Sequence, residues 1–172
     1  MRCIYTPYDI AIFFTASDFE QRKERSILHN IWKNDNALVP DIYRTDEVLF
    51  RRRVYAELSK FDGTPNDLDE LNLLMRDMGE SFYIKSESME QDIIESYFKI
   101  IKLELKYIPN LNHRKVKLRR LLKRFNYKRR SVKLVTNIKQ TLSTLELKTY
   151  LKDYVLCDIA DISIDDMIMI RL

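Results

Sequence analysis

The residues with the most evident chemical potential are the arginines and lysines of one segment near the C-terminal end. Residues 113–148 hold 13 of the 30 Lys and Arg residues of the 172-residue chain, but only one of its 26 Asp and Glu residues, Glu146. No acid stands between His113 and Arg130, so no ion pair along a helix can neutralise this run internally. Such a local positive field indicates a polyanionic partner, for which DNA is the first candidate and RNA stays open as an alternative.

Twelve polar residues of this segment have types and spacings suited to nucleic-acid contact. Guanidinium and ammonium groups bind phosphate oxygens, whereas amide and ammonium groups on one helix face can hydrogen-bond base edges in a major groove. Six residues are expected to contact phosphates: Arg119, Arg120, Arg124, Lys128, Arg129 and Arg130. Lys133, Asn137, Gln140 and Thr144 recur at helical spacing, and the first three are expected to contact bases. The predicted interface is completed by Arg114, Lys117 and Ser131, the last at a helix N-terminus, where backbone N–H groups favour a phosphate.

Two helices joined by a tight basic turn must position these side chains. In the stretch VKLRRLLKRF, one amphipathic helix with a cationic exterior is predicted by the shared face of Leu118, Leu121, Leu122 and Phe125. Ser131 is a favourable N-cap for a second helix, whose buried face is expected to hold Val135, Ile138, Leu142 and Leu145. After that helix, a short antiparallel pair of strands around Asp165-Asp166 is predicted by the alternation of Ile162, Ile164, Ile168, Ile170 and Leu172.

The order helix, turn, helix and two-stranded element resembles the winged-helix class of DNA-binding domains. The resemblance is carried by LLKRFNYKRRSVKLVTNIKQTLSTLELKTYL together with DISIDDMIMI, and it covers about the last third of the chain. It implies phosphate contacts from the first helix and the turn, and base contacts from the second helix. Because winged-helix proteins are commonly dimers that bind two half-sites, a homodimer is a reasonable expectation. The wing is acidic here, at Asp161, Asp165 and Asp166, where a groove-contacting wing is often basic.

The rest of the chain, residues 1–110, is expected to form a helical domain whose role the sequence leaves open. Only two Gly and four Pro favour helices with short connections, so the predicted fold class is mainly α with a small C-terminal β-hairpin. Helix starts are marked by Thr6-Pro7 with Asp9 and by a capping box at 17–20, and further helices are predicted over 45–61, 66–78 and 88–108. The charge balance changes sign at PNLNH, residues 109–113, which places the predicted boundary of a basic winged-helix-like domain, 111–172, at that point.

Two alternatives to DNA binding come from other functional classes. In a protein-interaction module, the basic face docks an acidic protein partner. In a metal-dependent nuclease, Glu104-Leu-Lys106 supplies the E-x-K spacing that such enzymes use on a strand, with Asp92 upstream, but the predicted helix over 88–108 does not bring the two groups to one side. We therefore expect a non-catalytic protein without cofactor or metal, since neither glycine belongs to a phosphate loop and neither histidine has partners at metal-ligand spacing.

Cysteine usage and hydropathy bear on the cellular setting. Cys3 and Cys157 are too few for a disulfide framework, which favours a reducing compartment. The apolar run near the start of the sequence is short and has Asp9, Asp18 and Glu20 around it. We therefore expect neither a signal peptide nor a membrane span, and a cytoplasmic location.

Overall fold

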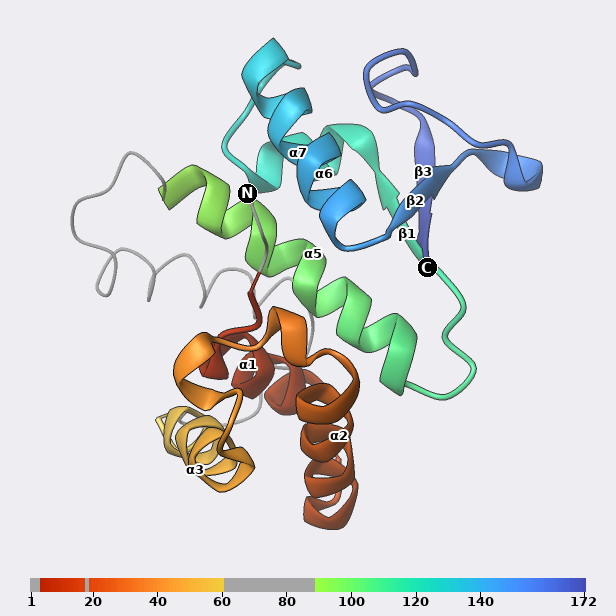
Figure 1. The fold of residues 1–172 in the computed structure, drawn as a ribbon. Helices are drawn as coiled ribbons and strands as arrows, with labels where there is room; N and C mark the ends of the chain where they lie inside the picture. The colour runs from red at the N-terminus through yellow and green to blue at the C-terminus, as the bar shows by residue number, and fades with distance from the viewer. Residues whose placement is uncertain (1–3, 18, 61–88) are drawn as a thin grey trace. The chain divides into compact units, whose positions relative to one another are not determined.

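The computed structural model describes residues 4–17, 19–60 and 89–172 (Figure 1). The chain divides into two compact units, Arg2–Leu74 and Met75–Leu172. This division differs from the boundary that we placed near residue 110, because the helix that ends at Tyr107 packs with the basic segment that follows it. The helix predicted over 66–78 lies outside the described residues. Among the described residues, no helix combines the length and the apolar character needed to cross a bilayer.

The N-terminal unit is helical throughout its described part. Its elements are α1 (Pro7–Ser17), α2 (Gln21–Asn34), the 3-10 turns η1 (Asn36–Leu38) and η2 (Asp41–Tyr43), and α3 (Glu47–Leu58). Helix α1 packs chiefly against α3, and its Ile10, Phe13 and Phe14 side chains are buried. Burial of these large apolar side chains supplies the main stabilisation of such a small unit.

Capping residues explain where two of these helices begin. The Asp9 carboxylate accepts hydrogen bonds from the Thr6 backbone N–H (2.9 Å) and hydroxyl (2.8 Å), and this confirms the predicted start of α1. The predicted capping box at 17–20 is wrong, because Ser17 is the last residue of α1 and α2 begins only after Glu20, which makes no side-chain cap. Helix α3 is capped by Asp46, whose carboxylate accepts from the Leu49 backbone N–H at 2.8 Å.

The C-terminal unit combines three helices with a small antiparallel sheet. In chain order its elements are α5 (Met89–Tyr107), β1 (Arg114–Lys117), α6 (Leu118–Arg124), α7 (Val132–Thr144), β2 (Lys148–Tyr150), the 3-10 turn η3 (Lys152–Tyr154) and β3 (Met167–Arg171). Strand β3 lies in the centre of the sheet and pairs with β1 and β2, with Val116 opposite Ile168 and Thr149 opposite Ile170. The predicted fold class, mainly helical with a small β element, is therefore confirmed.

The core of this unit fixes α6 and α7 relative to α5 and the sheet. Tyr97 and Phe98 of α5 contact the ring of Phe125, which follows α6, at centroid distances of 5.6 and 6.3 Å. Fully or nearly fully buried side chains come from α5, α6, α7 and β3: Ile94, Phe98, Leu118, Leu121, Leu122, Leu134, Ile138, Leu142, Ile168 and Ile170. Because apolar residues of both α6 and α7 are buried, most of their polar residues are left on the surface, with Thr141 as a buried exception.

Three local predictions need correction. Residues 114–117 form strand β1 and not the start of the first basic helix, because Val116 packs inward and pairs with β3. In α7 the buried face contains Leu134, whereas Val135 is only half-buried. No strand pair forms around Asp165-Asp166, because β3 finds its partners in β1 and β2.

Candidate nucleic-acid interface

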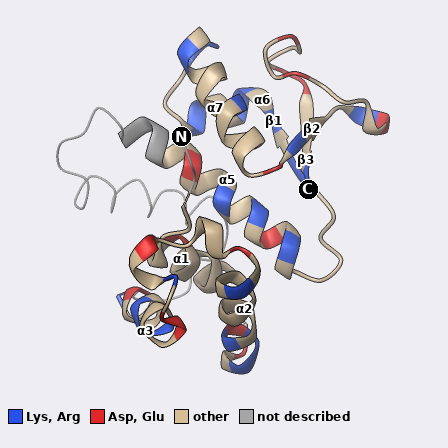
Figure 2. Cartoon of the chain, viewed as in Figure 1, with Lys and Arg blue, Asp and Glu red and all other residues tan. Residues whose placement is uncertain are grey.

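The predicted contact residues lie on β1, α6, the turn at 125–131 and α7. Figure 2 shows Lys and Arg positions, in blue, along α6 and at the start of α7, and acidic positions, in red, on the loop that precedes β3. That loop, residues 151–166, is called the wing loop below. The side chains of the predicted set fall into two groups, those engaged within the protein and those directed to solvent.

Arg114 belongs to the engaged group. Its guanidinium donates two hydrogen bonds to the Glu104 carboxylate of α5, Nε to Oε2 at 2.7 Å and Nη2 to Oε1 at 2.5 Å. Glu104 is only 2% exposed, and burial raises the pKa of its carboxyl group, an effect that Arg114 partly offsets. Arg114 therefore compensates a buried carboxylate and ties β1 to α5.

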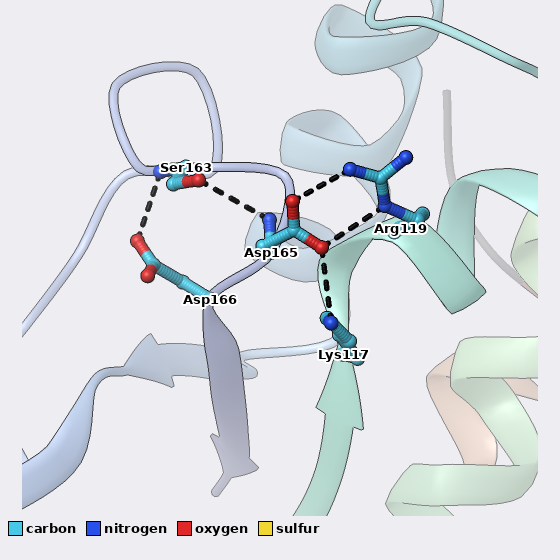
Figure 3. Close-up of polar contacts among 5 residues, drawn as sticks. All are labelled: Lys117, Arg119, Ser163, Asp165 and Asp166. Carbon is cyan, nitrogen blue, oxygen red and sulfur yellow. Dashed lines mark hydrogen bonds and ion pairs between the residues drawn. The ribbon is translucent and has the colours of Figure 1, made fainter.

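Lys117 and Arg119 are engaged by one carboxylate of the wing loop, that of Asp165 (Figure 3). Arg119 donates from Nη2 to Oδ2 at 2.6 Å and from Nε to Oδ1 at 3.0 Å, and the Lys117 ammonium lies 3.0 Å from Oδ1. The hydrogen bonds from Arg119 and Lys117 hold the pKa of Asp165 well below its ordinary value of 3.8. In turn, Asp165 raises the pKa of the Arg119 guanidinium.

Arg130 is engaged by the wing loop in a different way. Its Nη1 lies within hydrogen-bonding distance of the carbonyl oxygens of Ile159, Ala160 and Ile162, at 3.0, 2.7 and 2.6 Å. A second tie comes from Lys139 of α7, whose ammonium lies 2.5 Å from Asp158 Oδ2. Arg130 thus anchors the wing loop to the turn before α7. Its Nη1 hydrogens are already directed to carbonyl oxygens of that loop.

Four cations of α6 and the turn form the group directed to solvent. Arg120, Lys123, Lys128 and Arg129 are exposed, and none of them has a carboxylate partner among the described residues of their own unit. We call these four side chains the open cation cluster. Sequence analysis missed Lys123, although it lies in the same acid-free run and on the polar side of α6, so counting every cation of that helix would have found it. Arg124 differs, because its guanidinium lies 4.9 Å from the centroid of the Tyr97 ring.

Helix α7 presents a polar face beside this cluster. Ser131 caps the helix as predicted, since its hydroxyl accepts from the Leu134 backbone N–H at 3.2 Å. Lys133 and Gln140 are exposed and Asn137 is half-buried, while the Thr144 hydroxyl is turned back to the Gln140 carbonyl oxygen at 2.9 Å. Helix α7 contains no acidic residue, so nothing on the helix itself repels a phosphate or a base acceptor.

The E-x-K residues do not share a face. Glu104 and Lys106 both lie in α5, where residues two positions apart point to different sides, and the Glu104 carboxylate is occupied by Arg114. Across the residues whose positions are described, no three His, Cys, Asp or Glu side chains are placed to hold a metal ion together.

No family model, curated protein or solved structure matches this chain. The function is therefore inferred from the charges and the geometry of the C-terminal unit.

Proposed function

We propose that the C-terminal unit is a winged-helix-like domain that binds DNA without catalysing a reaction. The order of its elements supports this proposal, since α6, a tight turn and α7 are followed by the antiparallel pair β2 and β3. In helix-turn-helix proteins the second helix enters the major groove and the surrounding cations hold the phosphates. Helix α7 is the second helix in this order of elements, so we assign it the role of entering the groove.

The open cation cluster is the observation that carries the proposal. Four like charges on α6 and its following turn repel one another, and no acid in the described part of the C-terminal unit compensates them. A DNA backbone supplies regularly spaced negative charges, and its binding releases condensed counterions. Phosphate contacts through Arg120, Lys123, Lys128 and Arg129 therefore set the affinity, whereas Lys133, Asn137 and Gln140 supply the base contacts.

A charge-matched comparison tests the phosphate role. Lys128→Ala/Arg129→Ala removes two cations of the cluster, and the control Lys33→Ala/Arg52→Ala removes two exposed cations of the N-terminal unit. Affinity for a 20-base-pair duplex is measured by fluorescence anisotropy across a salt series. The first variant is expected to reduce the slope of log affinity against log salt by about 2, and the control to leave it unchanged. Equal slopes for both variants and the wild type contradict the proposal.

One observation favours the alternative of a protein partner. Tyr154, Val155 and Leu156 of the wing loop are consecutive, apolar and 58–66% exposed, and exposed apolar patches often mark protein contacts. Competition separates the two functions. A short duplex at physiological salt displaces a labelled duplex from a DNA-binding surface, whereas a polyglutamate peptide does so only if the cationic surface accepts any polyanion.

The oligomeric state and the cellular location form a further part of the proposal. A homodimer places two copies of α7 on two half-sites of a DNA duplex, which raises both affinity and specificity. A cytoplasmic location fits a chain with two cysteines and no disulfide framework. Sedimentation of the protein with and without duplex measures the stoichiometry, and two chains per duplex is the expected result.

A further inference from the structure

The contact between the wing loop and the cationic segment has the geometry of an occupied anion site. Asp165 receives a two-point hydrogen bond from Arg119 and an ammonium contact from Lys117, all between 2.6 and 3.0 Å (Figure 3). A guanidinium fork with a neighbouring ammonium is also the arrangement that binds a phosphate group. The carboxylate of Asp165 therefore stands where two oxygens of a phosphate fit.

All three side chains of this contact are open to solvent. The exposed fractions are 45% for Lys117, 49% for Arg119 and 51% for Asp165. Ion pairs with this exposure contribute little to stability, so an outside anion can replace the carboxylate at small cost. Glu104 and Arg114 form a contrasting pair, because the buried Glu104 carboxylate has no access to solvent from which a competitor could displace it.

We propose that Lys117 and Arg119 form a phosphate site that Asp165 occupies as an internal competitor, and that a DNA backbone phosphate displaces Asp165 from it. This inference rests on the proposed function and adds a regulatory element to it. The wing loop stays attached during the exchange, because Arg130 and Lys139 hold it at other points. The Asp165 carboxylate thus lowers the affinity for DNA, while the rest of the wing loop stays bound to the turn and to α7.

A matched pair of substitutions in the same loop tests the exchange. Asp165→Asn removes the competing charge, and Asp161→Asn removes an equally acidic, exposed side chain that has no ion-pair partner in the described chain. Relative to Asp161→Asn, Asp165→Asn is expected to bind a 20-base-pair duplex about fivefold more tightly, because no carboxylate has to be displaced from Lys117 and Arg119. Adding Arg119→Ala to Asp165→Asn is expected to abolish this gain.

Two outcomes overturn the inference in different ways. Equal duplex affinities for Asp165→Asn and Asp161→Asn contradict the competition while leaving the proposed function intact, provided that the wild type keeps its steep salt dependence. Failure of the wild type, Asp165→Asn and Asp161→Asn to bind the duplex contradicts both the competition and the proposed function. An NMR signal gives an independent readout: the Arg119 Nε–H resonance of the wild type is expected to shift when duplex is added, and a resonance that stays in place contradicts displacement of Asp165.

Discussion

One carboxylate of the C-terminal unit engages two exposed cations that an outside anion could otherwise contact. Asp165 engages Lys117 and Arg119 together, and it lies 46 residues from Arg119 in sequence. Both cations are exposed, so their availability depends on a contact that solution conditions and substitutions can change.

The pKa of Asp165 provides the first prediction at the residue scale. Because hydrogen bonds from Arg119 and Lys117 lower this pKa, the contacts are fully present above the ordinary value of 3.8 and are lost as pH falls through the lower, folded-state value. Arg119→Ala is expected to raise the pKa back toward 3.8. Carbon-detected NMR of the Asp165 carboxyl group across an acid titration measures its pKa in the wild type and in Arg119→Ala. A wild-type pKa near 3.8 argues against the ion pairs in solution.

The second prediction at the residue scale concerns base contacts by α7. Asn137→Ala/Gln140→Ala is expected to reduce the preference for the best duplex over an unrelated one by at least about fivefold, since each amide–base pair contributes about 1–3 kcal/mol of discrimination. Affinity for unrelated duplexes should stay the same. Gln21→Ala/Asn30→Ala in α2 is the control, because it removes the same two amide groups elsewhere. If affinity for every duplex falls equally, α7 does not contact bases.

At the scale of elements, adjacent arginines before α7 have different tasks. Arg129 is exposed, whereas Arg130 donates to three carbonyl oxygens of the wing loop. Arg130→Ala is therefore expected to increase amide hydrogen exchange in residues 158–162, and Arg129→Ala to leave exchange unchanged while weakening DNA binding. Hydrogen exchange followed by mass spectrometry compares the two variants. Equal exchange in both variants rules out the anchoring role of Arg130.

The link between α5 and β1 depends on the pair of Glu104 and Arg114. Arg114→Met leaves a buried carboxylate without its guanidinium partner, and it is expected to lower the free energy of unfolding by about 3 kcal/mol. Lys115→Met is the neighbouring control, because Lys115 is exposed on the same strand. Urea unfolding of both variants measures the difference; equal midpoints show that the ion pair does not stabilise this unit.

Local signals predicted the helices better than the sheet. The Thr6 and Ser131 caps and the spacing of Leu118, Leu121 and Leu122 are visible within a few residues, and the corresponding helices form. Strand β1 offers only Val116 as an apolar residue, and its partner β3 lies about 50 residues further along the chain, so no local pattern indicates it.

The same distinction applies to the candidate site. The excess of positive charge follows from counting residues, but which cations are engaged depends on contacts between distant segments. Arg119 and Arg130 meet partners 46 and about 30 residues away, and Arg124 meets the ring of Tyr97. Of the six predicted phosphate contacts, the open cation cluster therefore retains Arg120, Lys128 and Arg129, and gains Lys123.

At the scale of the whole molecule, the chain separates its charges. One segment carries 13 of the 30 basic residues and a single acid, so the small net charge of +4 hides a strong local field. Acids of the wing loop and of α5 engage part of that segment, and the open cation cluster is what they leave. A surface of this kind binds a polyanion more tightly at low salt than at high salt.

The salt dependence of duplex binding by the intact wild-type chain tests this account most directly. Four phosphates neutralised by the open cation cluster predict a slope of log affinity against log salt of about −4, and a steeper one if Asp165 gives way to a fifth and a sixth phosphate. A slope near zero, or no binding of a 20-base-pair duplex at about 50 mM salt, contradicts the proposal that this unit binds DNA.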